Sequence, residues 1–224
     1  MSNETFLVKT PWDARAFGVD TYELREISEE SLEKIRTMRG HFTVKTDPLA
    51  SKKLLHAYGF YYCDTLLEPH CSVERFVSYE HGSVTLSTDV GLDELLAICH
   101  GAFEHGRYHR DFHITKEMAD VRYDNWLKDL YAAGNCFALL YDGEVAGFFG
   151  VNGSKIVLHA LAGRFKGKGL AKYFWSSACR KLFSQGHQEL TSSVSASNVS
   201  VLNLYASLGF RFRNPCDVYH LAHF

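Results

Sequence analysis

Apolar positions in the second two thirds of the chain switch between helical and strand periods, and this alternation predicts the order of the elements. Residues 78–87 have the composition of a strand. Apolar residues then recur every three or four positions over 91–103 and 115–134, which predicts two consecutive helices. Thr115 is a suitable N-cap for the second helix, and Gly134 is a suitable end.

Three β-rich runs follow within residues 136–162. They are separated by the dipeptides Asp142-Gly143 and Asn152-Gly153, which favour tight hairpin turns because both central residues of such turns adopt positive φ. We therefore expect an antiparallel meander of three strands.

The end of the chain continues the alternation. We expect a helix from near Gly169, a strand over 188–196, a helix from near Asn198, and two short strands over 210–214 and 216–224. Helices that interrupt an antiparallel meander indicate a mixed sheet of the α+β class rather than a doubly wound parallel sheet.

Residues 1–77 resemble this last part of the chain, and we expect them to form a smaller N-terminal α/β domain beside a larger domain of residues 78–224. Aligning 41–60 with 191–210 matches a valine, a leucine and a Gly-Phe pair at equal spacing. Two interpretations are open, a degenerate repeat of half of the larger domain or a generic strand-helix-strand unit. At the position of Tyr205 the N-terminal segment has a leucine.

The composition is that of a soluble globular protein. Hydrophobic residues make up 46% of the 224 residues, and a formal net charge of -2 argues against bulk electrostatic binding to nucleic acid or to a membrane. The sequence shows neither an apolar run of membrane-spanning length nor a secretory signal, so we expect a cytoplasmic protein. The 6 cysteines form no CxxC pair and no zinc-like cluster, so we expect reduced, mostly buried thiols and no metal site.

Glycines and bases alternate in IVLHALAGRFKGKGLAKYF, residues 156–174. Glycine lets the backbone approach a ligand closely, and the amides that begin the following helix would carry partial positive charge. The bases Arg164, Lys166 and Lys168 would add hydrogen-bond donors for a pyrophosphate. The spacing alone also fits a solvated turn, and it matches neither the dinucleotide-binding nor the nucleoside-triphosphate loop.

Together with NVSVLNLYASLGF, residues 198–210, this stretch resembles the GCN5-related N-acetyltransferase (GNAT) superfamily. The segment RFKGKGLA, Arg164 to Ala171, matches the family's [RQ]xxGx[GA] acetyl-CoA signature, and residues 198–210 match its asparagine, helix, tyrosine and Gly-Phe ending. The resemblance implies the GNAT fold, with a central, mostly antiparallel sheet flanked by helices, and an acetyl-CoA-dependent N-acetyltransferase.

The resemblance also implies where acetyl-CoA lies. Its pyrophosphate would rest on the amides and bases after the third meander strand, and its pantetheine arm would run along that strand like an added strand. A backbone amide near Ala160 or Leu161 would stabilise the oxyanion, and Asn198 either contacts the coenzyme or only caps its helix. The expected coenzyme contacts are Ala160, Leu161, Ala162, Arg164, Lys166, Gly167, Lys168, Gly169, Leu170, Ala171 and Asn198.

Tyr205 matches the tyrosine with which the family commonly protonates the departing CoA thiolate, and a packed core aromatic is the structural alternative. The implied attack on the thioester is direct and needs a free amine. The proton of that amine could go to His159 on the third meander strand, to Glu144 through water, or to solvent. We therefore name Tyr205 and His159 as the candidate catalytic residues.

Within the superfamily the chain is similar to the TDP-fucosamine acetyltransferase group. This similarity implies transfer of acetyl to the 4-amine of dTDP-4-amino-4,6-dideoxy-D-galactose or of a similar nucleotide-linked amino sugar. Gly106 replaces the serine that is usual in that group, which leaves the exact sugar open. The matching positions are Trp12, Phe17-Gly18-Val19, Phe103, Arg107-Tyr108, Asp111, Tyr123 and Trp126-Leu127.

The segment GRYHRDFH, between the two predicted helices, would border the acceptor. Its arginines could grip a diphosphate and its tyrosine could stack on a base or sugar; packing or surface roles are the alternative. His105, His109 and His113 have helical spacing, but the loop-like sequence between them argues against a metal. The expected substrate contacts are Arg107, Tyr108, His109 and Arg110.

Two rival functions are consistent with the same motifs. One is acetylation of another small amine or of a peptide N-terminus, and the other is a noncatalytic acyl-CoA sensor that binds the coenzyme without turnover. In each enzymatic interpretation the partner is a small-molecule or peptide amine. A homodimer would be in keeping with the superfamily.

Overall fold

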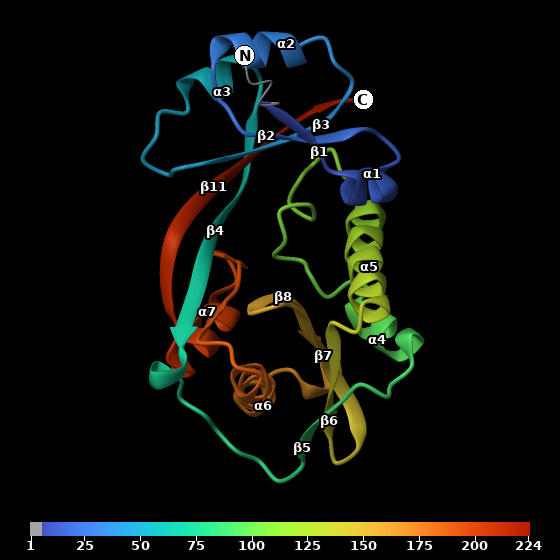
Figure 1. Cartoon of the computed structure of the whole chain (residues 1–224). Coiled ribbons are helices and arrows are strands. Elements are labelled where there is room, and N and C mark those ends of the chain that lie inside the picture. Colours follow the sequence, from blue (N-terminus) through green and yellow to red (C-terminus); the bar gives the residue numbers. More distant parts are fainter. Residues whose placement is uncertain (1–5) are drawn as a thin grey trace.

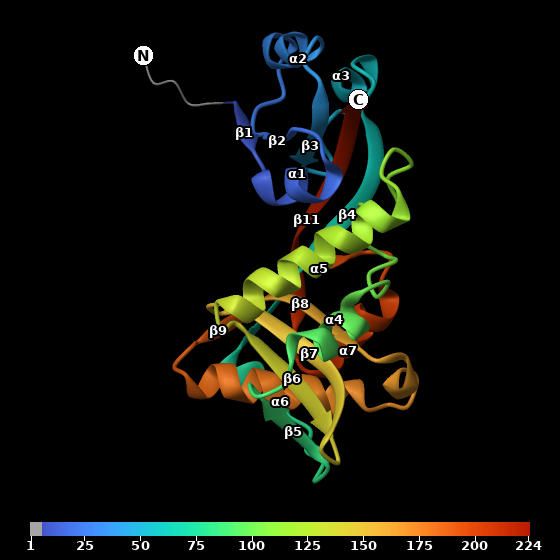
Figure 2. The same ribbon diagram turned by 90° about the vertical axis from the view of Figure 1, so that its right-hand side faces the viewer.

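The structure, a computed structural model, describes residues 6–224 (Figures 1 and 2). Residues 1–5 of the expected N-terminal domain lie outside the described residues. The first elements are β1 (Leu7–Lys9), α1 (Pro11–Phe17), β2 (Thr21–Leu24), α2 (Glu29–Ile35), β3 (Gly40–Thr46), α3 (Lys53–Ala57) and β4 (Tyr61–Ser72). They are followed by β5 (Val84–Ser87), α4 (Leu92–Cys99), α5 (Lys116–Ala132), β6 (Cys136–Tyr141), β7 (Glu144–Asn152), β8 (Lys155–Leu161), α6 (Ala171–Ser184), β9 (Glu189–Thr191), β10 (Val194–Ser195), α7 (Val199–Ser207) and β11 (Arg211–His223).

The described strands form one mixed sheet with helices on both faces, which confirms the expected fold class. The strand order is β1-β2-β3-β11-β4-β9-β8-β7-β6-β5, and β10 pairs with β4 beside β9. The long strands β4 and β11 run antiparallel through the middle and connect the upper and lower parts of the molecule in Figure 1. Because β4 pairs with β9, the sheet runs without interruption across the boundary expected after residue 77.

One strand-helix-strand-helix-strand unit recurs on either side of the β4-β11 pair. In the N-terminal half, the parallel strands β2 and β3 are connected by α2, and α3 leads into β4. In the C-terminal half, the parallel strands β8 and β9 are connected by α6, and α7 leads into β11. The last strand of each half pairs with a strand of the other half: β11 pairs with β3, and β4 pairs with β9. This arrangement supports the hypothesis of an internal repeat, which stays a prediction.

The local turn and cap predictions are confirmed. The strands β6, β7 and β8 form the expected antiparallel meander, and its turns contain Asp142 at φ 50° and Gly153 at φ 57°. The Thr115 side chain accepts a hydrogen bond from the Met118 amide at the start of α5. These features depend on residues within a few positions of one another, which is why the sequence predicts them.

Two strand predictions are wrong in detail. The expected pair of short strands at the C-terminus is one strand, β11, whose register with β4 shifts between Arg213 and Cys216 around Asn214 at φ 51°. The expected strand over 188–196 is instead two strands, β9 and β10, which pair with β4 in one register. Between them the Ser192 amide donates to the Pro69 carbonyl (2.9 Å), but Pro69 has no N–H to return to the ladder. Both differences follow from pairing with β4, which is distant in sequence.

Helices cover the two faces of the C-terminal half of the sheet with separate apolar layers. Phe149 and Trp175 belong to the layer under α6 and α7. Phe148 and Leu127 belong to the layer under α4 and α5, on the opposite face. Among the helices of residues 6–224, none is both long enough and apolar enough to cross a membrane.

Candidate active site

The parallel strands β8 and β9 separate almost as soon as they meet. Lys155 pairs with Thr191, and the next contact is a hydrogen bond of 2.9 Å from the Ser192 hydroxyl to the carbonyl of Ile156. Beyond this point β10 follows β4 through the pair of Val194 with Leu67, away from β8. The backbones of β8 and β9 therefore diverge in a V along the second half of β8, next to the glycine-rich segment, and we call this separation of the two strands the opening.

The backbone of β8 presents hydrogen-bonding groups to this opening. The Ala162 amide donates to the Ala146 carbonyl on β7 (2.8 Å), and antiparallel pairing alternates along a strand. The amides of Leu161 and His159 therefore face the other edge of β8, toward the opening, whereas Ala160 is in the ladder with β7. Of the two expected oxyanion donors, the Leu161 amide has the suitable direction. The register shift with β7 also leaves Val157 as an extra residue, a β-bulge.

The glycine-rich segment forms an open loop before α6. Gly167 and Gly169 adopt φ of 73° and 71°, a left-handed conformation that favours glycine, and no atom lies within 4 Å of where a Cβ would stand. The N-cap of α6, Leu170, has no side-chain cap hydrogen bond. The first amides of α6 therefore lack a side-chain acceptor at the cap, and such amides bind anions well.

The bases of this loop point in different directions. Arg164 forms an ion pair with Glu144 (2.7 Å) and donates to the Val145 carbonyl (3.1 Å), so its guanidinium rests on the β6-β7 hairpin. This ion pair also holds Glu144, the alternative proton acceptor. Lys166 and Lys168 are exposed on the loop and provide its remaining positive charge.

Tyr205 and His159 are brought together beside the opening. Tyr205 is fully buried on α7, and its hydroxyl lies 3.1 Å from Nε2 of His159. Burial raises the pKa of Tyr205, so the phenol stays protonated at neutral pH. Burial also lowers the pKa of His159 to about 4, so its imidazole is neutral there. A neutral phenol-imidazole pair can pass a proton in either direction without creating an isolated buried charge.

Asn198 caps α7. Its side-chain oxygen accepts a hydrogen bond of 3.3 Å from the Val201 amide and another of 3.0 Å from the Ser200 hydroxyl. Asn198 therefore caps its helix, and its contact with the coenzyme stays a prediction.

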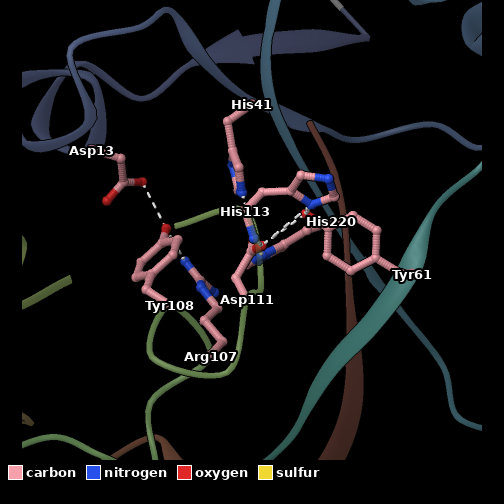
Figure 3. Close-up of polar contacts among 8 residues, drawn as sticks. All are labelled: Asp13, His41, Tyr61, Arg107, Tyr108, Asp111, His113 and His220. Carbon is pink, nitrogen blue, oxygen red and sulfur yellow. Dashed lines mark hydrogen bonds and ion pairs between the residues drawn. The ribbon is translucent and has the colours of Figure 1, made fainter. Parts of the chain in front are cut away.

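The α4-α5 loop, residues 100–115, leaves the C-terminal half and packs against the N-terminal half (Figure 3). The Tyr108 hydroxyl donates to Asp13 of α1 (2.9 Å), and Arg107 donates to that hydroxyl (2.9 Å). Tyr108 is 2% exposed and stacks on His220 of β11, so its ring is not open to a base or a sugar. This tyrosine ties the loop to both α1 and β11.

The next residues of the loop also have partners within the protein. His109 contacts Asp120 of α5 (2.8 Å), and Arg110 donates to Asp64 of β4 (2.8 Å). Two of the expected substrate contacts are therefore engaged in side-chain pairs with helix and strand residues.

Asp111 is the centre of a buried cluster that joins the loop to the N-terminal half of the sheet (Figure 3). One carboxylate oxygen lies 2.8 Å from His41 Nε2 and 2.7 Å from His220 Nδ1, and the other accepts from the Tyr61 hydroxyl (2.9 Å). Burial alone would raise the pKa of Asp111, but the hydrogen bonds from His220 and His41 hold it well below its usual range. Burial lowers the pKa of His220 to about 3.

The ligand atoms of His41, Asp111 and His220 lie within 4.8 Å of one another, close enough for one metal ion to reach all three. Two ligands of one tetrahedral zinc ion would be about 3.3 Å apart, given bond lengths of about 2.0–2.1 Å. The contacts of 2.7 and 2.8 Å are hydrogen-bond lengths, so the cluster has the geometry of a carboxylate that accepts two imidazole N–H groups.

A cleft of about 440 Å³ lies between the two halves, and sequence reasoning did not predict it. Its walls come from α1, β2 and β3 of the N-terminal half and from α5, the α4-α5 loop and the start of β8. Of the four expected substrate contacts, Arg107 lines this cleft, and Trp12 and Trp126 stand on two of its walls. The two tryptophans were the available sequence signal, but nothing in their spacing shows that they face each other.

Comparisons with known proteins bear on the family and on the fold. Residues 103–210 match the model of the acetyltransferase (GNAT) family, a segment that includes the α4-α5 loop, the glycine-rich loop and Tyr205. Curated proteins yielded no sequence match.

Solved structures of low sequence identity share the fold. A GCN5-related N-acetyltransferase from Sphaerobacter thermophilus aligns with a TM-score of 0.61 at 12% identity, over 96% of this chain and 75% of that chain. One from Kribbella flavida aligns with a TM-score of 0.57 at 12% identity, over 91% and 81% of the two chains. A tandem GNAT protein from the clavulanic acid biosynthesis pathway aligns with a TM-score of 0.55 at 10% identity, over 92% and 76%. The similarity therefore extends over both halves.

Proposed function

We propose that this chain is a GNAT N-acetyltransferase, which the family model matched by residues 103–210 and the shared fold support, and that it acetylates the amine of a nucleotide-linked amino sugar. The observation that carries the coenzyme part of the proposal is the opening between β8 and β9, which has the glycine-rich loop at one end and Tyr205 beside it. A thioester arm can add to the free edge of β8 there, because the edge offers unpaired amides.

The residues of the opening have separable roles. Acetyl-CoA supplies the acetyl group as a thioester. The loop amides near Gly167 and Gly169, with Lys166 and Lys168, hold the pyrophosphate. The Leu161 amide faces the position of the thioester oxygen and stabilises the negative charge that develops on it.

Tyr205 and His159 handle the protons. As the carbon–sulfur bond breaks, Tyr205 donates its proton to the leaving sulfur. The nitrogen that forms the amide bond loses one proton, and His159, 3.1 Å from the phenol, is placed to return that proton to Tyr205. With a pKa of about 4, His159 is too weak a base to keep the proton, so it passes the proton on to Tyr205. An acceptor that arrives as an ammonium ion first loses its extra proton to solvent.

The acceptor part of the proposal has two supports. The first is the similarity of the chain to the TDP-fucosamine acetyltransferase group at Trp12, Arg107 and Trp126. The second is the cleft between the halves, where these three residues lie together among further cationic side chains. Cations and indoles are the groups that bind a diphosphate and a nucleobase.

A thiol-release assay with a panel of amines tests this function. We expect turnover with nucleotide-linked 4-amino-4,6-dideoxyhexoses and little with aminoglycosides, polyamines or peptides. Turnover with the last three amines but none with amino-sugar nucleotides would overturn the acceptor assignment. Coenzyme binding without turnover on any amine would favour the acyl-CoA sensor.

A further inference from the structure

The cleft between the two halves has more positive than negative side chains on its walls. Its five cationic residues face three carboxylates. Each carboxylate is already paired, since Arg15 bonds Asp129, Arg122 bonds Asp13 and Lys45 bonds Glu23, each at 2.8 Å. The two remaining cations are Arg107 and Lys155.

These two cations come from opposite walls. Lys155 is an exposed residue at the start of β8, and the described residues place no carboxylate within ion-pair distance of it. Arg107 comes from the α4-α5 loop, where its guanidinium lies 4.7 Å from the centre of the Tyr108 ring and bonds the hydroxyl of that ring, a neutral partner. Two cations without anionic partners in one concave site are suited to a ligand that carries two negative charges.

Aromatic surface continues from this charged region. Trp12 is 51% exposed although it lies on the cleft wall. Trp126 lies on the facing helix α5, where the Arg122 guanidinium stacks 4.5 Å from the centre of its ring. Both indoles also line an adjoining groove of about 330 Å³, which Asn135 and Asn152 line as well. An exposed indole beside primary amides provides a stacking face and hydrogen-bonding groups for a nucleobase.

The cleft lies on the approach to the opening between β8 and β9. Lys155 lines the cleft and Val157 lines the groove, both on the α5 side of the sheet. The His159 ring packs on Phe149 and Trp175 on the α6-α7 side, so an acceptor held in the cleft would reach the reaction site through the separation of β8 from β9. Lys155 and His159 are four positions apart on this strand, a distance of about 13 Å. A hexose ring fits between a diphosphate held at Lys155 and an amine presented near His159.

From this geometry we infer that the cleft binds the nucleoside diphosphate part of the acceptor. Arg107 and Lys155 bind the two phosphates, Trp12 stacks on the base, and the sugar extends toward Tyr205. The inference rests on the proposed function where it makes the nucleotide the carrier of the amine. It makes Lys155 and Trp12 specificity-determining residues, and it gives the N-terminal half a direct part in substrate binding.

Calorimetric titration of the protein with thymidine diphosphate and with uridine diphosphate tests the site. The protein is first saturated with CoA, so that the probes cannot bind in the coenzyme site through their phosphates. We expect one probe molecule per chain, quenching of tryptophan fluorescence, and at least tenfold weaker binding in Lys155→Ala and in Trp12→Ala. Lys128→Ala, an exposed residue of α5 outside the cleft, is the matched control and should bind as the wild type does.

The results separate this inference from the proposed function. Absence of binding, or binding that both cleft variants leave unchanged, overturns the cleft assignment even if amino-sugar nucleotides are acetylated. Binding that depends on Lys155 and Trp12 supports the cleft even if no amino-sugar nucleotide is turned over, and in that case the proposed function fails alone. Unchanged melting temperatures of the two variants would show that the loss of binding is local.

Discussion

A strand-helix-strand-helix-strand unit occurs in both halves of the sheet, but its parallel strands separate only in the C-terminal half. In the N-terminal half β2 and β3 stay paired through four consecutive positions, from Thr21 with His41 to Leu24 with Val44. In the C-terminal half β8 and β9 share one pair, Lys155 with Thr191. A coenzyme arm can add to a strand edge only where that edge is unpaired. The comparison therefore teaches that strand separation, and not the repeated topology, produces a site.

The helix caps and the side chains of the N-terminal half also lack the features of the proposed coenzyme site. The helix α2 begins with a capping box in which Ser28 and Ser31 satisfy each other's amides, whereas α6 begins at Leu170 without a side-chain cap. The position that corresponds to Tyr205 is Leu55, which is buried in the N-terminal core. The N-terminal half consequently lacks these three features of the proposed coenzyme site. It instead contributes a cleft wall and the residues that hold the α4-α5 loop.

Replacing Tyr205 by phenylalanine should give the largest effect and would remove the chemical difference between the halves. We expect turnover to fall by about 10²- to 10⁴-fold, because the leaving sulfur loses its proton donor. The dissociation constant of acetyl-CoA should change little, since the ring still packs against Phe210. Steady-state kinetics and calorimetry measure the two quantities.

The control for this variant is Tyr58→Phe, which removes a hydroxyl from the N-terminal half. It should retain wild-type turnover. If Tyr205→Phe turned over at the wild-type rate, Tyr205 would have no part in proton transfer, and its matching position in the motif would reflect packing alone.

Replacing Asp111 by alanine should separate the α4-α5 loop from the N-terminal half. The change leaves His41, His220 and Tyr61 without their buried acceptor, so we expect the free energy of unfolding to fall by about 3–5 kcal/mol. Urea denaturation measures it. The exposed carboxylate Asp89, replaced in the same way, should change stability by less than about 0.5 kcal/mol. Equal stability of the two variants would show that the cluster does not hold the halves together.

Replacing Gly169 by valine should impair the coenzyme loop selectively. A β-branched residue at φ 71° is strained by about 1–3 kcal/mol, so the loop shifts and acetyl-CoA binds roughly 5- to 100-fold more weakly. Gly18→Val is a matched control, since Gly18 has φ 70°, equally open surroundings and a place in the N-terminal half. It should lower stability without changing the dissociation constant of acetyl-CoA. Equal weakening by both variants would argue against an anion site at residues 163–170.

The sequence predicts those parts of the molecule that depend on neighbouring residues. The meander turns at Asp142 and Gly153, the Thr115 cap and the glycine-rich loop follow from local backbone chemistry. The position of β4 between β9 and β11 does not, because strand pairing between distant segments depends on the assembled sheet. For the same reason, β4 is predicted within the N-terminal domain of residues 1–77, although the strand pairs with β9 and β11.

The α4-α5 loop shows how far the sequence alone can predict which residues of the site contact a ligand. From sequence, Tyr108 and Arg110 are plausible ligand contacts, because polar side chains in a loop usually face solvent. In the structure they are paired with Asp13 and Asp64, which lie 95 and 46 positions away. A motif indicates which side chains are present, but it does not show whether a distant carboxylate has already engaged them.

The pH dependence of stability offers the finest comparison, since it tests one imidazole in each half. The pKa of His220 in the folded protein is lowered by burial to about 3, below its ordinary value of about 6.5. The unfolded chain therefore binds a proton that the folded protein does not, and stability is complete above about pH 6.5 and declines as the pH falls toward 3. His159, with a pKa lowered to about 4, contributes in the same direction, so each imidazole adds up to about 1.4 kcal/mol per pH unit.

His220→Asn isolates the contribution of the N-terminal cluster. An asparagine amide can replace the Nδ1 donor to Asp111 but does not titrate, so we expect the decline in stability between pH 6.5 and 5 to become about half as steep. Urea denaturation at several pH values measures this slope. His159→Gln should remove the other half of the slope, and in addition it should lower turnover because it interrupts the proton path to Tyr205. An unaltered slope in His220→Asn would mean that His220 is already protonated in the folded protein, and that Asp111 is held by a charged partner.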